Sequence, residues 1–154
     1  MSRALVCWGA SKQMPIRILI ADDDPAIRLL LRRFIESHSF WEVCGEAQNG
    51  IEALEKARQL SPDLVILDCA MPLMTGLQAA GEIAKLFPAV PMLLVSVQQV
   101  SPALVLAARE VGLKGAVTKD RGSEVVAGVE ALLRNETFFP VDETVLQAMR
   151  KSAG

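Results

Sequence analysis

At 154 residues, 51% hydrophobic and 22% charged, the chain has the length and apolar content of one ordinary globular domain, which excludes wholesale disorder. Its formal net charge of −2 gives no basic footprint, so we expect no nucleic-acid binding by this chain itself. No apolar run reaches the roughly 20 residues that cross a bilayer, so we expect no membrane partner.

The three cysteines are odd in number and lie far apart, at Cys7, Cys44 and Cys69. This spacing argues against a disulfide framework and against a zinc site, and it predicts a reducing, cytoplasmic compartment. Residues 1–15 leave little room for a signal peptide and its cleavage site before the first apolar strand. We interpret 1–15 as an N-terminal extension.

Five apolar, largely β-branched segments predict strands, and they alternate with helical patterns. The predicted strands cover residues 16–21, 41–47, 63–68, 91–97 and 115–119. The predicted helices cover residues 25–38, 50–60, 77–87, 102–111 and 123–133. Buried strands that alternate with helices favour a parallel sheet with helices on both faces, which is an α/β fold.

Local signals place several helix ends and faces. Asp24 stands before Pro25 and is interpreted as an N-cap, and Asn49 is expected to cap the second helix. Glycine commonly ends a helix, so we expect Gly112 to end the fourth predicted helix. Apolar periodicity puts Leu30 on the inner face of the first helix and Ile51 on that of the second.

Polar side chains stand where the apolar strands end. Asp22 and Asp23 follow the first strand, and the third, fourth and fifth strands end in Asp68, Ser96 and Lys119. Ligands of open parallel sheets bind at the carboxyl ends of the strands, where the strand order reverses. We therefore expect these five residues to share one shallow pocket.

The residue types in this pocket point to metal-assisted phosphoryl chemistry. Clustered carboxylates repel one another, and a small dication such as Mg²⁺ relieves that repulsion, so Asp22 and Asp23 are the natural metal holders. Asp68 stands alone on its strand and is the natural nucleophile toward phosphorus. Lys119 and Ser96 offer an ammonium and a hydroxyl group to phosphoryl oxygens.

The segments ILIADDDP, DLVILDCAMPLMTGL, LLVSV and GAVTKD, in this order, resemble the receiver domain of bacterial two-component response regulators over residues 16–134. The resemblance implies a flavodoxin-like, doubly wound sheet of five parallel strands in the order 2-1-3-4-5. It implies that Asp68 accepts a phosphoryl group from a sensor histidine kinase or a small acyl phosphate. Mg²⁺, or Mn²⁺, would be bound by Asp22 or Asp23, by Asp68 and by the backbone carbonyl of Ala70.

The same resemblance implies a switch that catalyses its own phosphorylation and slow dephosphorylation. Ser96 and Lys119 would contact the phosphoryl group, and Ser96 would move toward it. The change would be relayed to the face formed by the fourth helix, the fifth strand and the fifth helix, through which a homodimer would form. Gln98 is either a simple polar loop residue or an influence on how fast the phosphoryl group is lost.

Three positions depart from the family pattern. Ala116 stands in the fifth strand where an aromatic residue is usual, and Val97 follows Ser96 where a small residue is usual and is expected to crowd the pocket. Asp120 follows Lys119 in place of proline, as in the NarL-type branch whose receivers precede a helix-turn-helix. These departures predict intact phosphorylation chemistry with an altered readout.

Residues 135–154 are open to two interpretations. They resemble the linker into a DNA-binding domain, in which case the receiver controls transcription through an output domain absent from this chain. Alternatively, they form a short extra helix at about 141–151 in a stand-alone receiver.

Other functions were weighed against the switch. A phosphorylation-independent interaction module is favoured by Ala116 and Val97. An aspartyl phosphatase fits poorly because Cys69 and Ala70 follow Asp68 where a second aspartate is required, and the acidic run would repel a flavin phosphate. Cys69 itself is interpreted as a packing residue, since neighbouring carboxylates disfavour its thiolate.

Overall fold

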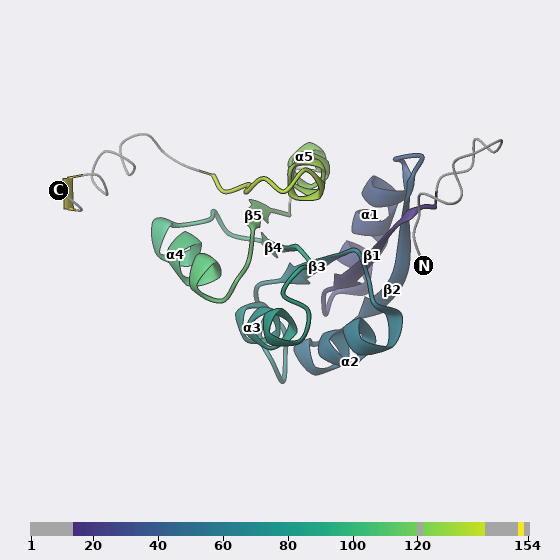
Figure 1. Cartoon of the computed structure of the whole chain (residues 1–154), viewed down its shortest axis with the longest axis horizontal. Coiled ribbons are helices and arrows are strands. Elements are labelled where there is room, and N and C mark those ends of the chain that lie inside the picture. Colours follow the sequence, from purple (N-terminus) through teal and green to yellow (C-terminus); the bar gives the residue numbers. More distant parts are fainter. Residues whose placement is uncertain (1–13, 120–121, 141–150, 153–154) are drawn as a thin grey trace.

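The computed structural model describes residues 14–119, 122–140 and 151–152. At its centre lies a parallel sheet in the order β2-β1-β3-β4-β5 (Figure 1). The strands are β1 (Ile16–Ala21), β2 (Trp41–Ala47), β3 (Leu64–Asp68), β4 (Met92–Ser96) and β5 (Gly115–Thr118). The order and the parallel pairing confirm the predicted flavodoxin-like α/β fold.

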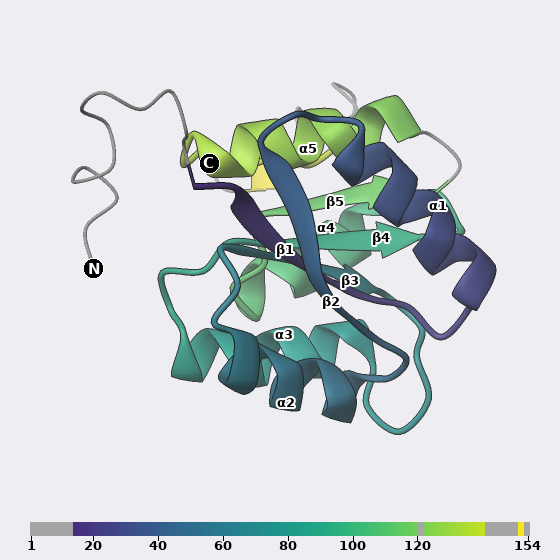
Figure 2. The ribbon, with the colours of Figure 1, turned by 90° about the vertical axis from the view of Figure 1, so that its right-hand side faces the viewer.

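Helices cover both faces of this sheet. They are α1 (Pro25–Glu36), α2 (Gly50–Leu60), α3 (Gly76–Leu86), α4 (Pro102–Glu110) and α5 (Gly122–Leu133). α1 and α5 lie on one face and α2, α3 and α4 on the other, which Figures 1 and 2 show as layers above and below the strands. The sheet is therefore buried on both sides, as its continuous apolar strands predict.

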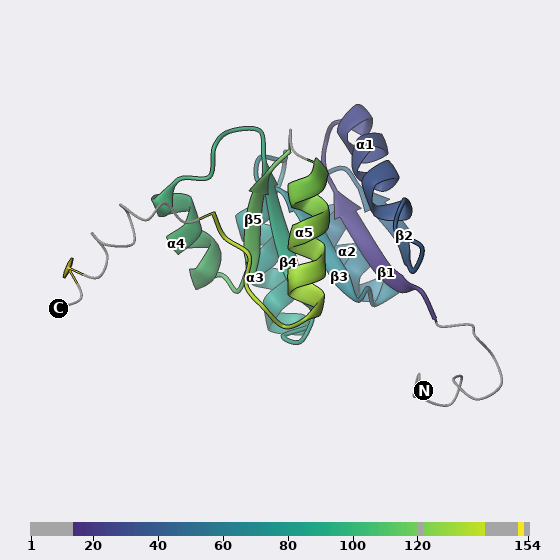
Figure 3. The ribbon, with the colours of Figure 1, turned by 90° about the horizontal axis from the view of Figure 1, so that it is seen from above.

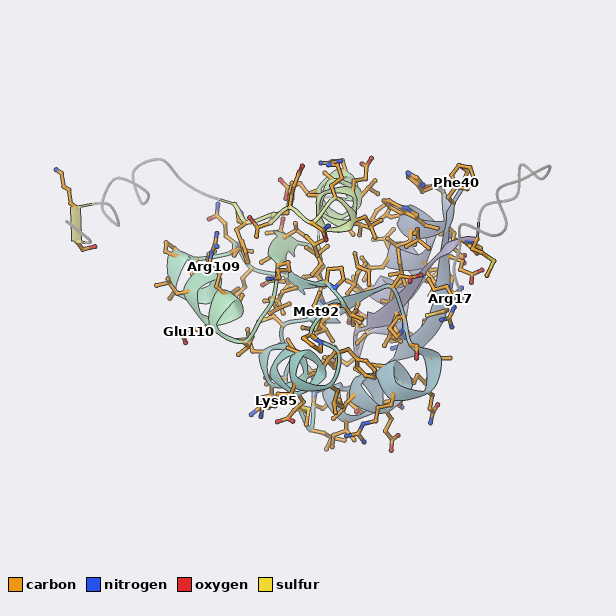
Figure 4. All side chains as sticks on the ribbon, in the orientation of Figure 1. Arg17, Phe40, Lys85, Met92, Arg109 and Glu110 are labelled. Atoms are coloured by element: carbon orange, nitrogen blue, oxygen red, sulfur yellow. The ribbon has the colours of Figure 1, made fainter. Side chains whose placement is uncertain are left out.

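The central strand β3 shows how the strands serve two apolar layers at once. Leu64 and Ile66 pack with α1 and α5, whereas Val65 and Leu67 pack with the helices of the opposite face. All four are fully buried, because successive side chains of a strand point to opposite faces. Met92 of β4 lies in the interior as well (Figure 4).

The predicted helix-end residues are confirmed. Asp24 accepts a hydrogen bond from the backbone N–H of Ala26 at 2.9 Å, ahead of the first helical residue Pro25. Asn49 accepts one from the N–H of Glu52 at 2.8 Å. Just after α4, Gly112 has φ = +99°, a conformation that glycine adopts without steric cost.

Two residues predicted for the inner helix faces lie outside instead: Leu30 is 39% exposed and Ile51 is 45% exposed. In α2 the buried side is made of small residues, including Gly50 and Ala53. A Cβ at Gly50 would lie 2.2 Å from the carbonyl oxygen of Met74, so the start of α2 presses directly on the loop before α3. This close approach turns the small residues inward and the bulky isoleucine outward.

The segment after α5 folds back along β5 (Figure 3). The N–H of Ala116 donates to the carbonyl of Phe138, and the N–H of Phe138 donates to the carbonyl of Lys114, both at 2.9 Å. The half-buried Phe138 packs with the α5 layer. Phe139 packs with the opposite layer, where the guanidinium of Arg109 lies 4.5 Å from its ring centroid (Figure 4). The segment thereby covers part of the open edge of β5.

Two predicted terminal segments are not open to description. The predicted helix at 141–151 lies almost wholly outside the described residues, as does most of the extension 1–15. Within the described part of the chain, no helix is both long and apolar enough to cross a membrane.

Replacing Phe138 tests how much the returning segment stabilises the fold. Phe138→Ala removes a half-buried ring from the α5 layer, so we expect the free energy of unfolding, measured by urea denaturation, to fall by about 1–3 kcal/mol. Phe40→Ala is the matched control, because its ring is 47% exposed, and we expect a change within about 0.5 kcal/mol. Equal losses in the two variants would show that the segment adds no stability.

Candidate functional site

The carboxyl edge of the sheet gathers the polar residues that end the strands. These are Asp22 and Asp23 after β1, Asp68 at the end of β3, Ser96 at the end of β4 and Lys119 after β5. Figure 3 shows β1 and β5 pointing toward this common edge. Asp22, Asp68, Ser96 and Lys119 are buried, whereas Asp23 is exposed.

The three carboxylates form a compact group of oxygen donors. One oxygen each from Asp22, Asp23 and Asp68 lies within 4.8 Å of the other two. Oδ2 of Asp22 is buried, and its one close partner among the described residues is the single ammonium group of Lys119, 2.7 Å away. A buried carboxylate oxygen is costly unless a cation neutralises it. The donor set therefore fits a hard dication such as Mg²⁺, which prefers carboxylate oxygens.

Lys119 bridges the two buried carboxylates. Its Nζ lies 2.7 Å from Oδ2 of Asp22 and 3.0 Å from Oδ1 of Asp68. Its backbone N–H donates to the carbonyl of Ser96 at 2.8 Å, which fixes the residue after β5 against the end of β4. Burial works against the ammonium charge, but the two carboxylates outweigh burial and raise the pKa of Lys119. Lys119 is therefore charged, and the three carboxylates still leave the pocket negative.

Asp22 is held at three points where β1 ends. Its N–H donates to the carbonyl of Ala47 at 2.9 Å, and its Oδ1 accepts from the N–H of Asp24 at 2.9 Å. Its carbonyl accepts from Nη1 of Arg28 at 2.6 Å. Sequence reasoning missed Arg28, because an arginine on a helix whose other face is apolar is indistinguishable from an ordinary solvent-facing residue.

The loop after Asp68 is shaped by a glycine. A Cβ at Gly76 would lie 2.1 Å from the carbonyl oxygen of Asp68, so α3 can begin this close to β3 only with glycine there. The N–H of Gly76 donates to the carbonyl of Cys69 at 3.1 Å. Ala70 follows directly, and its N–H points at Oδ1 of Asp68 from 3.4 Å. Leu73 adopts φ = +67°, a strained value for a leucine.

The turn after β4 orients the hydroxyl of Ser96 and exposes Val97. The hydroxyl of Ser96 accepts a hydrogen bond from the N–H of Gln98 at 3.2 Å, which orients its oxygen. Val97 is 74% exposed, so its side chain is not packed among the buried residues of the site. It is the first residue after β4, which ends at Ser96.

Burial changes the acidity of the residues around the pocket. Burial raises the pKa of Asp68 to about 6, with Lys119 opposing the rise and the negative charge of Asp22 adding to it. Burial and the neighbouring Asp68 likewise raise the pKa of the Cys69 thiol. Cys69 is only partly exposed and packs against the α2, α3 and α4 layer, in line with its interpretation as a packing residue.

His38, the only histidine of the chain, plays no part in this pocket. Its ring stacks on Trp41 with a centroid separation of 3.8 Å and an interplanar angle of 7°. Trp41 is the first residue of β2, so this stack lies near the amino ends of the strands, whereas the acidic residues lie at their carboxyl ends. Helix α1 ends at Glu36, two residues before the predicted end.

The family model for the response regulator receiver domain matches residues 18–130. The chain belongs to this family. The fold, the strand order and the acidic residues after β1 and at the end of β3 agree with the resemblance that the sequence motifs carry.

Individual relatives refine the comparison. The receiver is similar to the chemotaxis protein CheY of Thermotoga maritima, with 39% identity over 103 residues, which are 67% of this chain and 84% of that protein. It is also similar to the protein-glutamate methylesterase/protein-glutamine glutaminase of Pyrococcus abyssi, with 46% identity over 81 residues, 53% of this chain. The chain spans only 22% to 31% of such methylesterases.

A solved structure supports the predicted branch of the family. The two-component response regulator of the LuxR family from Aurantimonas sp. SI85-9A1 matches with a TM-score of 0.79 and 30% identity. The match covers 90% of this chain and 98% of that one. This likeness agrees with the NarL/LuxR-type assignment that the sequence favours.

The raised pKa of Asp68 predicts a pH-dependent stability of the metal-free protein. Folding disfavours the ionised carboxylate, so stability falls as pH rises from the usual 3.8 to about 6 and stays lower above that. We expect Asp68→Asn to raise the free energy of unfolding at pH 7.5 by roughly 1–3 kcal/mol. This gain should shrink to about 0.5 kcal/mol at pH 4, where Asp68 is protonated in the folded state and roughly half ionised in the unfolded chain.

Urea denaturation in the presence of a metal chelator, between pH 4 and pH 8, measures this difference. Asp24→Asn is the matched control, because asparagine is an equally good N-cap and Asp24 is exposed. A gain for Asp68→Asn that is the same at pH 4 and pH 7.5 would contradict the assignment.

Proposed function

We propose that this receiver is a phosphoacceptor switch in which Asp68 takes a phosphoryl group from a sensor histidine kinase or a small acyl phosphate, in a Mg²⁺-dependent reaction. The observation that carries the proposal is the buried arrangement of Asp22, Asp68 and Lys119, with the exposed Asp23 beside it. Negative charge in excess of one ammonium favours a bound dication. A carboxylate next to a lysine suits transfer of an anionic phosphoryl group.

Asp22, Asp23 and Asp68 are the residues that would hold Mg²⁺, or Mn²⁺ in its place. The family resemblance adds the backbone carbonyl of Ala70 as a further ligand. When bound, the ion supplies positive charge that neutralises the transferring phosphoryl group. The exposure of Asp23 leaves one side of the cluster open to water, which suits an ion that keeps part of its hydration shell.

The transfer itself is a displacement at phosphorus. A carboxylate oxygen of Asp68 attacks, and a new oxygen–phosphorus bond forms. The bond from phosphorus to the donor's imidazole nitrogen or acyl oxygen breaks, and the leaving group keeps the electron pair. With its pKa raised to about 6, Asp68 is still mostly ionised at pH 7.5, as a nucleophile must be.

Two side chains beside Asp68 supply donors for the phosphoryl oxygens. Lys119 already lies 3.0 Å from Oδ1 of Asp68, and its raised pKa keeps it protonated. The hydroxyl of Ser96 uses its oxygen to accept from Gln98, which leaves its proton free to be donated. The resemblance implies that Ser96 moves toward the phosphoryl group in the active form.

The consequences for partners follow from the family. The donor is a sensor histidine kinase in the cytoplasm, and the changed surface is the face of α4, β5 and α5, through which the receiver would form a homodimer. In a NarL/LuxR-type protein this change would control transcription through an output domain. The returning segment with Phe138 and Phe139 lies against β5, so it is part of that face.

A phosphorylation-independent interaction module is the second candidate. The observation that favours it is Ala116, which is fully buried in β5 and too small to rotate between an inner and an outer position. Val97, the other residue on which this candidate rests, is exposed.

Phosphorylation by a small donor decides between the two candidates. After incubation with acetyl phosphate and Mg²⁺, we expect intact mass spectrometry to show the gain of one phosphoryl group. Asp68→Asn should abolish the gain, and a chelator should reduce the labelling rate at least about 100-fold. Asp24→Asn should be labelled at the wild-type rate, because Asp24 caps α1 and takes no part in the cluster.

Failure of wild-type protein to gain mass, under conditions that label the CheY relative, would overturn the switch and favour the interaction module. Labelling that persists in Asp68→Asn would place the phosphoryl group elsewhere and would equally contradict the assignment.

A further inference from the structure

We propose that Arg28 is a positioning residue for the metal site: it holds the end of β1 so that the carboxylate of Asp22 faces Asp68. The inference rests on the proposed function, since it concerns the same acidic cluster. It assigns to α1 a direct part in setting the affinity for Mg²⁺, although Arg28 itself touches neither the ion nor the phosphoryl group.

The first step is the contact between Arg28 and Asp22. The side chain of Arg28 is only 18% exposed, and its Nη1 donates to the carbonyl oxygen of Asp22 at 2.6 Å. Asp22 is the first residue beyond the paired part of β1, because the register of the sheet ends at Ala21 on both sides. Its carbonyl therefore gains from the side chain of Arg28 a hydrogen bond that no neighbouring strand supplies.

The second step is the anchor that fixes Arg28. Its Nε donates to Oε1 of Glu46 in β2 at 3.0 Å. The other oxygen of Glu46 accepts from Nε and Nη2 of Arg32 at 2.9 and 2.6 Å, and Lys56 donates to the Glu46 backbone carbonyl. Burial works against the Glu46 charge, but the hydrogen bonds from Arg32 and Arg28 outweigh it and lower the pKa of Glu46.

The third step is geometric. A guanidinium is planar, and its donors have fixed directions, so one group can bind Glu46 through Nε and Asp22 through Nη1 at the same time. The Asp22 backbone is then held between the Ala47 carbonyl on one side and Arg28 on the other. Lys119 bridges the carboxylates of Asp22 and Asp68, whereas Arg28 fixes the backbone from which the Asp22 carboxylate projects.

A positioning role and a simple charge effect predict opposite results for the same variant. Removing a cation near a metal site strengthens Mg²⁺ binding on Coulomb grounds alone. Removing a residue that orients a ligand weakens it, commonly by 10-fold or more. Arg28→Met keeps the apolar stem and removes the fork, so the direction of the change separates the two.

The test is a titration of the whole chain with MgCl₂ in the absence of any phosphoryl donor, followed by the amide NMR signals of Asp22 and Asp23. We expect Arg28→Met to raise the Kd for Mg²⁺ about 10-fold. Arg28→Lys should raise it similarly, because a lysine keeps the charge but cannot bind Glu46 and Asp22 with one planar group.

The matched control is Arg32→Met, which removes the other arginine on Glu46, and the hydrogen bonds of Arg32 in the described part of the chain go to Glu46 and Glu36. We expect it to leave the Kd within about twofold of wild type. In acetyl phosphate labelling, Arg28→Met should need about 10-fold more Mg²⁺ for half-maximal rate, and the rate at saturating Mg²⁺ should stay within about twofold. A residue needed only for folding would not change the Mg²⁺ requirement while leaving the rate at saturating Mg²⁺ unchanged.

Several outcomes would overturn the proposal. They are an unchanged or tighter Mg²⁺ affinity in Arg28→Met, a wild-type affinity in Arg28→Lys, an equal loss in Arg32→Met, and a wild-type chain that binds no Mg²⁺. Should Arg28→Met not fold, Arg28→Lys alone carries the test. Wild-type protein that binds Mg²⁺ with this dependence on Arg28, yet gains no phosphoryl group, would contradict the proposed function and leave the positioning role standing.

Discussion

The structure depends on one electrostatic constraint: two buried carboxylates, those of Asp22 and Asp68, share a single ammonium group. Buried charges are tolerated only when opposite charges and hydrogen bonds compensate them. Here the charges come from three strands, because Asp22 follows β1, Asp68 ends β3 and Lys119 follows β5. Lys119 comes from the end of β5, and its backbone is tied to Ser96 at the end of β4. A shift of any one strand would break the arrangement.

The sheet topology places this charge where a ligand can reach it. The chain runs outward from β1 to β2 and then crosses back to β3 on the other side, so the strand order reverses between β1 and β3. The helices that follow β1 and β3 leave on opposite faces of the sheet, which is the arrangement that binds ligands in open α/β folds. Asp22 and Asp68 end these two strands, and glycine at position 76 lets α3 begin close to the backbone of Asp68.

Sequence reasoning could reach the fold and the pocket residues because each has a local signature. Buried strands are continuous apolar runs, and the polar residues follow them directly. It placed Ile51 wrongly, because the inner side of α2 is chosen by close contact of Gly50 with a distant loop. Two contacts could not be predicted in this way: the hydrogen bond from Arg28 to Asp22 and the bridge between Phe138 and β5. No repeating pattern of residue types in the sequence marks either contact.

The same strand that ends in the pocket also carries the returning segment. β5 has four residues: Lys119 follows its last one, and Ala116 within it binds the backbone of Phe138. Ala116 and Phe139 pack in the same apolar layer, so the aromatic bulk near α4 comes from the segment after α5 and not from β5 itself. A displacement of β5 along its axis would move the ammonium of Lys119 and the hydrogen bonds to Phe138 together. One short strand therefore carries both a residue of the acidic site and the backbone hydrogen bonds to the segment after α5.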